Sequence, residues 1–394
     1  MPARCFHWMQ LTMSTVSYAL LSEQQAMIRE SARRVAQEVV APTAAQRDQA
    51  SQWPRAEIEA AAGAGFMGML IPEEYGGSGL SFVEYCLALE EFAAADGGFT
   101  TIMHVHNSCG LVLRAFGAEA QKRHYLPQIA SARSIGAFLL SEPQAGSDTA
   151  AFRATARREG DHYVLNGTKQ WISNGSEAGV ALVIAATGEP GSRERFSLFI
   201  VDPAAPGYKV LRVEDKLGQR TAHTAQIQLD ELRVPADNLV GEEGRGYSKV
   251  LGLLSDGRVA IAALAVGIAR AALEAALRYA QEREAYGQPI SALQAIRFDL
   301  AEMAMQVDVA RQYSLHAARL IDAGIPAARE SAMAKLFASE MAETVCSQAL
   351  QVHGGYGYVK DFPVERYYRD VRVTKIYEGT SHIQKHIIAR SLLG

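Results

Sequence analysis

The spacing of hydrophobic positions divides the chain into three zones. Residues 22–135 are rich in alanine and carry apolar residues at helical spacing between glycine and proline breaks. Residues 136–243 contain short β-branched or aromatic runs, such as Val180–Ala185 and Phe196–Val201, separated by turn residues. Residues 244–394 return to helical spacing. The order of elements is therefore helical, then β, then helical, and we interpret residues 1–21 as an N-terminal extension.

Local patterns refine this division. Ser22 followed by Gln25 predicts a capping box at the start of the first helix. Apolar residues recur at alternating spacings of three and four across 293–310, which is typical of a helix bundle. Strands and helices do not alternate along the chain, so a doubly wound parallel sheet is excluded. The pattern favours a multidomain α+β fold with an antiparallel β-barrel or sandwich in the middle.

Composition narrows the class of protein. The 394 residues, 48% hydrophobic and 21% charged, are those of an ordinary globular chain with two or three domains. With 39 Lys and Arg against 43 Asp and Glu, the net charge of −4 argues against general nucleic-acid binding. The longest uninterrupted apolar run, Val259–Ala269, is too short to span a bilayer. Cys5, Cys86, Cys109 and Cys346 are scattered without a CxxC pair, which favours a reducing compartment.

Two patterns are rejected as binding motifs. Gly63, Gly65 and Gly68 fit GxGxxG, but a dinucleotide site needs a strand before the motif, and the preceding residues are typical of a helix. We interpret these glycines as a helix end and a close packing contact. His104 and His106 lack neighbouring carboxylates or thiols, so we interpret them as packed or surface residues and expect no metal site.

Two segments of the middle zone combine residue types that bind ligands. Leu140–Asp148 follows a predicted strand, and its Gly, Ala and Ser residues would let backbone N–H groups approach an anion. An ordinary Gly/Ser turn fits the same residues. Lys169–Gly175 places Trp171 beside hydroxyl and amide side chains, where it could cover a planar ring. The alternative is a core Trp at a strand end.

Two more segments with residue types that bind ligands lie in the C-terminal zone. Gln351–Tyr358 has three glycines in four positions after a helix, a pattern that ends a helix or lets backbone touch a ligand. Lys375–Thr380 places Glu378 between an aromatic residue and a glycine, just before the last predicted helix. Acidic residues near helix starts also occur for helix-dipole reasons alone, so each segment by itself leaves two interpretations open.

Taken together, the segments resemble the acyl-CoA dehydrogenase family of flavoproteins over residues 20–394. The specific motifs are Leu140–Asp148 and the glycine pattern of Gln351–Gly357, which continues through Asp361, Arg366 and Asp370. Supporting marks are Ile71–Gly77, Phe116–Gly117 and Gln121–Lys122.

The resemblance implies a fold and a reaction. Family members have an N-terminal helical domain, a middle β-domain and a C-terminal four-helix bundle, expected here at 22–135, 136–243 and 244–394. They typically form homotetramers that hold FAD partly across a subunit interface. They oxidise an acyl-CoA thioester to the trans-2-enoyl-CoA and pass electrons to electron-transfer flavoprotein. Glu378 matches the usual catalytic position, whereas a branched-chain subgroup has its Glu where this chain has Gly257.

The resemblance also assigns FAD contacts. Within one subunit they are Phe138, Leu140, Ser141, Gly146, Ser147, Trp171, Ile172 and Ser173. Ser141 would donate to the flavin, Trp171 would cover its ring, and Ser173 would reach its N5 edge. Gly146 and Ser147 would meet the phosphates and the mouth of the CoA channel. From the neighbouring subunit the expected contacts are Arg283, Gln294, Gln351, Gly354, Gly355, Thr380 and His382, the last of which is usually Gln in the family.

The implied chemistry explains the residue types at the substrate. The α-proton of a thioester is weakly acidic, so the base must be a desolvated carboxylate, here Glu378. Its backbone N–H and a flavin ribityl hydroxyl would stabilise the enolate-like oxygen while the β-hydride passes to flavin N5. The expected acyl-CoA contacts are Ser147, Ser255, Asp256, Arg258 and Gly379. The segment Met103–Ser108 favours a short or branched acyl chain.

Two alternatives remain beside this assignment. An acyl-CoA oxidase would pass electrons to oxygen, but such proteins usually carry a long additional C-terminal domain. A non-catalytic relative could bind FAD, CoA or DNA, yet residues 360–390 hold only seven Lys and Arg against four acidic residues. No nucleic-acid or membrane partner is expected. Residues 1–20 match neither a secretory signal nor an Arg-rich transit peptide. The expected location is the cytoplasm of a bacterium, or the mitochondrial matrix if the chain is eukaryotic.

Overall fold

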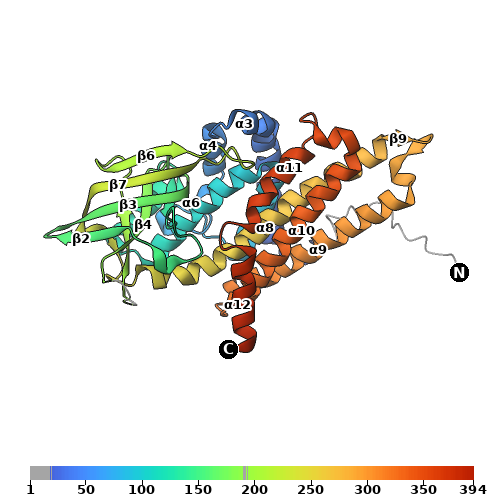
Figure 1. The fold of residues 1–394 in the computed structure, drawn as a ribbon. Helices are drawn as coiled ribbons and strands as arrows, with labels where there is room; N and C mark the ends of the chain where they lie inside the picture. The colour runs from blue at the N-terminus through green and yellow to red at the C-terminus, as the bar shows by residue number, and fades with distance from the viewer. Residues whose placement is uncertain (1–17, 19, 190–191, 193) are drawn as a thin grey trace.

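The computed structural model describes residues 18, 20–189, 192 and 194–394. Most of the expected N-terminal extension, with Cys5, lies outside the described residues, as do Pro190 and Gly191 of one predicted turn. Figure 1 shows the predicted order of zones as three regions in space. The sheet occupies one end of the molecule, and the long helices of the C-terminal zone extend away from it.

The N-terminal zone is helical, as predicted. The capping box predicted at Ser22 is present, with Gln25 and Ser22 bonding each other's backbone. A second box, formed by Ser81 and Glu84, starts the helix α5. The helices are α2 (Glu23–Val35), α3 (Ala44–Ala50), α4 (Arg55–Gly63), α5 (Phe82–Ala95), α6 (Gly97–Phe116) and α7 (Glu119–Ala130).

The middle zone forms a sheet in the order β6-β7-β3-β2-β4-β5-β8, with β1 on β4. The strands are β1 (Gly136–Leu139), β2 (Thr155–Glu159), β3 (His162–Ser173), β4 (Val180–Ala186), β5 (Phe196–Val201), β6 (Tyr208–Val213), β7 (Thr224–Pro235) and β8 (Leu239–Val240). The pairing is not wholly antiparallel as predicted, because β1 and β2 each pair with β4 in parallel. All residues of β4 are buried, since its two faces pack into different cores.

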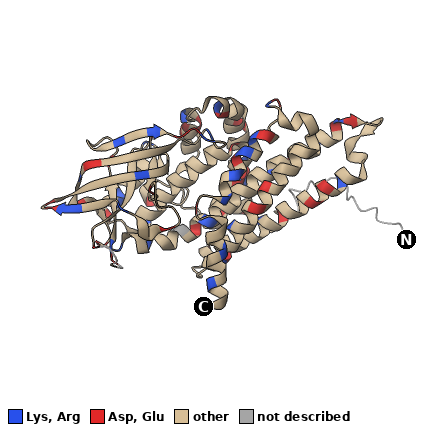
Figure 2. Ribbon diagram, viewed as in Figure 1, with Lys and Arg blue, Asp and Glu red and all other residues tan. Residues whose placement is uncertain are grey.

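The C-terminal zone is a set of long helices. They are α8 (Gly246–Glu282), α9 (Gln294–Asp322), α10 (Ala328–His353), α11 (Val364–Val371) and α12 (Ser381–Leu393), with the short strands β9 (Glu284–Ala285) and β10 (Gln288–Pro289) after α8. The predicted apolar seam lies on α9, where Leu300, Met303, Val307 and Ala310 are buried. Positively and negatively charged residues are interspersed along these helices (Figure 2).

Helix α8 is the centre of the helical core. It packs against α5 and α6 of the N-terminal zone and against α9 and α10 of its own zone. By length and composition alone it could cross a membrane, but 94% of its most apolar window is buried inside the protein, as in the core helix of a folded domain. A Cβ at Gly267 would lie 2.4 Å from the backbone oxygen of Glu90, so the close crossing of α8 and α5 requires glycine there.

The structure confirms that Gly63, Gly65 and Gly68 form no nucleotide loop. The helix α4 precedes them and ends at Gly63, and Gly65 has a left-handed φ of +84°. A Cβ at Gly68 would lie 2.8 Å from Ala130, so this glycine allows close packing.

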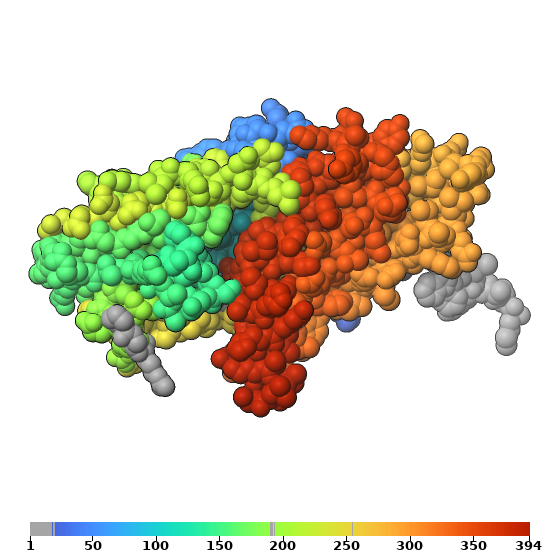
Figure 3. All heavy atoms as spheres, in the orientation of Figure 1, coloured from blue at the N-terminus to red at the C-terminus, as the bar shows by residue number. Residues whose placement is uncertain are grey.

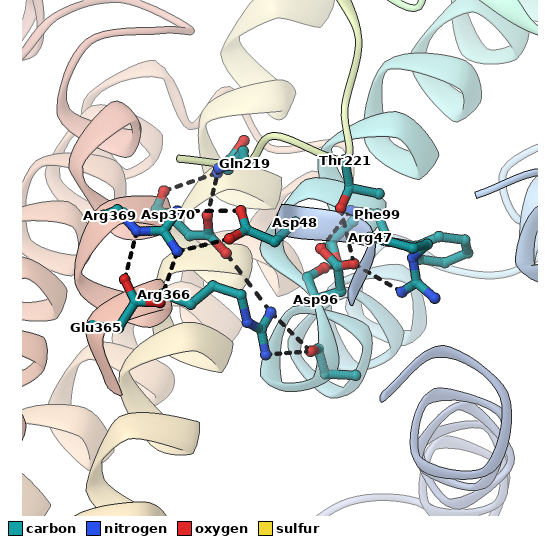
Figure 4. Close-up of polar contacts among 12 residues, drawn as sticks. Arg47, Asp48, Asp96, Phe99, Gln219, Thr221, Glu365, Arg366, Arg369 and Asp370 are labelled. Atoms are coloured by element: carbon teal, nitrogen blue, oxygen red, sulfur yellow. Dashed lines mark hydrogen bonds and ion pairs between the residues drawn. The ribbon is translucent and has the colours of Figure 1, made fainter. Parts of the chain in front are cut away.

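A buried polar network joins all three zones (Figure 4). Arg47 contacts Asp96, and the Asp96 carboxylate accepts a hydrogen bond from the backbone N–H of Phe99. In the loop between β6 and β7, the backbone N–H of Gln219 donates to Asp370 on α11. Arg369 then reaches back to Asp48 at 2.7 Å. The loop before β7 is therefore held between the first and last zones.

Asp370 is fully buried in this network, and its charge is only partly compensated. Burial raises the pKa of Asp370 to about 7; Arg366 opposes the rise and Asp96 adds to it. The ordinary pKa of Asp is about 3.9. The folded state therefore holds this proton over a range of pH in which the unfolded chain has lost it.

We expect the contribution of Asp370 to stability to fall as pH rises from about 4 through 7, because a raised folded-state pKa gives stability that is lost as the proton leaves. The lowered pKa of His106 has the opposite effect, equally in wild type and variant. Asp370→Asn imitates the protonated acid, so its melting temperature relative to that of wild type should rise between pH about 5 and 8. Thermal unfolding followed by circular dichroism across this range measures both slopes. Asp237→Asn, at an exposed site, is the control; equal slopes for Asp370→Asn and wild type would contradict the assignment.

Candidate functional site

The loop between α11 and α12 holds Glu378 in a strained conformation. Its φ of +52° is left-handed and that of Gly379 is +87°, which costs free energy unless the surroundings fix the loop. The side-chain amide of Gln384 on α12 donates to the backbone oxygens of Glu378 and Gly379, at 3.1 and 2.8 Å. Lys335 on α10 donates to the oxygen of Gly379 at 2.7 Å. Two helices thus fix the position of Glu378.

The carboxylate of Glu378 faces α8 and α6. A Cβ at Gly257 would lie 3.1 Å from Oε2, so the glycine leaves room for the carboxylate. On α6, His104 Nε2 lies 3.4 Å from Oε1. The Glu378 side chain is 22% exposed and the His104 side chain 3% exposed.

Cationic groups lie near this carboxylate. Burial lowers the pKa of Arg258, and the charge of Glu378 opposes that shift. Burial also lowers the pKa of Lys335 to about 8, again opposed by Glu378. Burial raises the pKa of Asp256 to about 6, against the effect of Arg258. Arg258 donates to Ser255 at 3.3 Å, so the expected substrate residues of α8 lie together in its first turns.

A small cavity of about 50 Å³ opens beside Glu378. Its wall is mainly apolar, with Tyr85, His104, Ser108 and Glu378 as the residues that carry polar groups. The remaining lining residues are Leu70, Phe82, Val105, Leu111, Val112, Phe138, Val250, Leu253 and Gly257. Figure 3 shows a recess between the β-domain and the C-terminal segment, the two regions that bring Phe138 and Glu378 to the site. The Glu378 carboxylate thus borders a mainly apolar space.

The turn after β1 is fixed by a buried ion pair. Lys169 Nζ lies 2.9 Å from Glu142 Oε1, and both side chains are almost fully buried. Glu142 also accepts hydrogen bonds from the backbone N–H groups of Arg153 and Ala154, and Lys169 donates to the oxygen of Leu140. Leu140 and Ser141 are therefore held at the sheet edge, while Gly146 and Ser147 are exposed. The sequence analysis assigned no role to Glu142 or Lys169.

Trp171 points outward from the sheet. The register of β3 and β7 shifts between Lys169 and Ile172, and Trp171 there has a left-handed φ of +63°. Its side chain is 61% exposed, so the alternative of a core Trp is wrong. Ser173 is half-buried. The Ile172 side chain lies in the core, which leaves its backbone for any contact with a cofactor.

A second cleft, of about 620 Å³, lies between the end of α8 and the end of α10. It brings together Arg283, Gln351, Gly354 and Gly355. Gly354 has a φ of +58°, and a Cβ on either glycine would meet nothing within 4 Å, so backbone borders open space there. Gln294 begins the adjacent helix α9 but is not among the residues that line the cleft.

The two halves of the expected FAD site lie apart within one chain. Figure 1 shows β9, next to Arg283, at the end of the molecule opposite the sheet that carries Trp171. Thr380 caps α12 by accepting from the backbone N–H of Ile383, and His382 is exposed. The exposed aromatic ring at Trp171 and the glycine-bordered cleft with a cationic side chain both fit a planar, phosphate-bearing cofactor.

The two histidines of α6 have different contacts. His106 is structural: it bonds the backbone of Ile129 and Gly136, and burial lowers its pKa to about 4. His104 is buried too, but it faces Glu378, which the sequence analysis missed. Its spacing of four residues from Ser108 shows only that the two side chains share one helix face, not which element that face contacts. Among the described residues, no cluster of three or more His, Cys, Asp or Glu could hold a metal ion.

Comparison with known proteins agrees with this architecture. Three acyl-CoA dehydrogenase domain families match the chain: the N-terminal domain over residues 22–133, the middle domain over 137–232 and the C-terminal domain over 244–393.

Individual relatives match over almost the full length. The chain is 46% identical over 375 residues to a probable acyl-CoA dehydrogenase, YngJ, of Bacillus subtilis, covering 95% of this chain and 99% of that protein. It is 44% identical to the mitochondrial short-chain specific acyl-CoA dehydrogenase of Mus musculus, covering 95% and 91%. The structure of butyryl-CoA dehydrogenase from Megasphaera elsdenii superposes with a TM-score of 0.93 at 36% identity, covering 95% and 99%. The chain belongs to the acyl-CoA dehydrogenase family of FAD-dependent oxidoreductases.

Proposed function

We propose that this enzyme oxidises a short-chain acyl-CoA to the trans-2-enoyl-CoA with Glu378 as the base. The observation that carries the proposal is the position of the Glu378 carboxylate at the edge of a small, mainly apolar cavity. A volume of about 50 Å³ accepts only a few water-sized groups, which favours a short acyl chain. The similarity to short-chain specific dehydrogenases supports the same size of substrate.

The residues around the cavity have different roles in the removal of the α-proton. Glu378 takes the α-proton of the thioester, and Gly257 leaves space for its carboxylate. The mainly apolar walls keep the reacting atoms away from bulk water. The backbone N–H of Glu378 donates to the thioester oxygen as negative charge develops there. We propose that Ser147, Ser255, Asp256, Arg258 and Gly379 contact the CoA part of the substrate.

FAD supplies the acceptor for the β-hydride. We propose that Phe138, Leu140, Ser141, Trp171, the Ile172 backbone and Ser173 hold the flavin, and that Gly146 and Ser147 hold its phosphates. The cleft with Arg283, Gln351, Gly354 and Gly355 lies at the other end of the chain, so a second subunit would complete the site. Gln294, Thr380 and His382 would contribute from the same neighbour. A homotetramer and electron transfer to electron-transfer flavoprotein complete the proposal.

We expect the purified protein to be yellow and to release FAD on denaturation, because an exposed Trp171 and an open glycine cleft suit a bound flavin. Absorption spectra and chromatography of the released cofactor test this. A colourless protein that takes up no FAD on reconstitution would overturn the cofactor assignment.

Glu378→Gln should keep FAD and bind substrate but lose turnover. Gln has nearly the same size and still forms hydrogen bonds, yet it cannot accept the α-proton. Removing a general base costs on the order of 10²–10⁴-fold. Anaerobic flavin reduction by an acyl-CoA, followed by stopped-flow absorbance, measures the loss. A rate within a few-fold of wild type would show that another group is the base.

Arg283→Ala should weaken FAD retention and subunit assembly together, because a guanidinium paired with a phosphate in a partly dry interface is a strong contact. Flavin content after dialysis and analytical ultracentrifugation measure the two properties. Arg123→Ala, which removes an exposed Arg of α7, is the control. Unchanged flavin content and assembly in Arg283→Ala would argue against a shared site.

A further inference from the structure

His104 is a buried group with one unused polar atom. Its side chain is 3% exposed, and among the described residues its Nε2 has no hydrogen-bond partner. That atom lies 3.4 Å from Oε1 of Glu378 and borders the same cavity. A buried polar atom without a partner is costly, so its orientation toward the carboxylate suggests a role in the site.

The other ring nitrogen of His104 is fixed by Tyr85 on α5. The Tyr85 hydroxyl lies 2.9 Å from Nδ1. Oε1 of Glu378 can only accept a hydrogen bond, so it would repel a lone pair on Nε2. The arrangement that avoids this repulsion has the Tyr85 hydroxyl donating to Nδ1. A neutral imidazole that accepts at Nδ1 carries its hydrogen on Nε2. The Nε2–H therefore faces Oε1 of Glu378.

The remaining groups around Glu378 come from other elements. Asp256 and Arg258 lie on α8 and Lys335 lies on α10, while Tyr377 precedes Glu378 in the chain. Lys335 uses its ammonium group on the backbone oxygen of Gly379. Because Gly257 has no side chain, α8 presents no hydrogen-bond donor from that position. His104 is thus the donor that α6 brings to the carboxylate.

We propose that His104, oriented by Tyr85, is a positioning residue for Glu378. In the substrate complex the 3.4 Å contact tightens, so that the Nε2–H donates to Oε1 and fixes the rotation of the carboxylate, which leaves Oε2 to accept the α-proton. The C–H bond of the substrate breaks and the new O–H bond forms on Oε2, while His104 keeps its own proton throughout. The inference rests on the proposed role of Glu378 as base. It adds a chain of hydrogen bonds in which Tyr85 orients His104 and His104 orients Glu378.

The first test replaces the donor. His104→Leu keeps an apolar side chain in the wall but has no N–H, and it should slow anaerobic flavin reduction by the best of a series of short straight-chain acyl-CoA thioesters by roughly ten-fold or more. His104→Gln retains a donor at the matching position and should restore most of the rate. The dissociation constant of the substrate and the FAD content should stay near wild type. The melting temperature of His104→Leu should fall, because the buried Tyr85 hydroxyl loses its partner.

The second test uses pH. A donor to the charged form of a carboxylate favours that form, so losing it should move the acid limb of the rate profile to higher pH in His104→Leu. The same profile in His104→Gln should stay close to wild type. A role in packing alone would lower the rate without moving this limb.

The third test asks whether Tyr85 acts on Glu378 through His104. Tyr85→Phe should give a smaller loss of rate, and this loss should vanish when His104 is already Leu, because Tyr85 acts through the imidazole. Tyr163→Phe, which removes a hydroxyl bonded to Glu243 far along the β-domain, is the matched control and should leave the rate unchanged. If His104→Leu does not fold, Tyr85→Phe and His104→Gln carry the test.

Three results would overturn the inference: a His104→Leu rate within two-fold of wild type, a His104→Gln variant as slow as His104→Leu, or fully additive losses for Tyr85 and His104. Failure of the proposed function is a separate outcome. It appears as fast flavin reduction in Glu378→Gln, whatever the His104 variants show.

Discussion

The close crossing of α5 and α8, with the buried charges that cover it, is the contact on which the rest of the structure depends. Arg311 on α9 bonds both carboxylate oxygens of Glu90, and Arg270 on α8 lies 2.7 Å from Glu91. Burial alone would raise the pKa of Glu90, but Arg311 and Arg270 outweigh it and lower that pKa to about 2. Removing one partner of such a buried pair typically costs about 3–5 kcal/mol. The first and last zones therefore share one hydrophobic core.

This shared core determines where the site lies. Helix α6 follows α5 directly and carries His104, and α8 carries Gly257 and Arg258. The polar network around Asp370 adds the β-domain: Gln219 bonds Thr101 on α6 at 2.7 Å and the hydroxyl of Tyr377 at 3.2 Å. Tyr377 is the residue before Glu378. The proposed base is thereby linked to all three zones.

The proposed chemistry needs opposite properties from the two halves of the site. The cavity beside Glu378 must be small and dry, and its apolar wall meets that need. The cleft at Arg283 is open and bordered by glycine backbone, which suits a charged and extended part of a cofactor. Figure 1 shows β9, next to Arg283, at the end of the molecule opposite the sheet that carries Trp171. The proposed FAD site would therefore need a neighbouring subunit, whereas the proposed base and the residues that hold it come from one chain.

The sequence by itself determined the order of zones, the capping box at Ser22, the rejection of the glycine motif at residues 63–68 and the family, because all of these rest on local periodicity, turn chemistry and short motifs. It also singled out Glu378. Only the tertiary structure decided three other features. These are the parallel pairing of β1 with β4, the outward orientation of Trp171 and the contact of His104 with Glu378. Residues 104 and 378 are separated by 274 positions, and no local pattern records which distant helices meet. Only the packing of α6 against α8 and of the Glu378 loop against α10 and α12 brings these two side chains together.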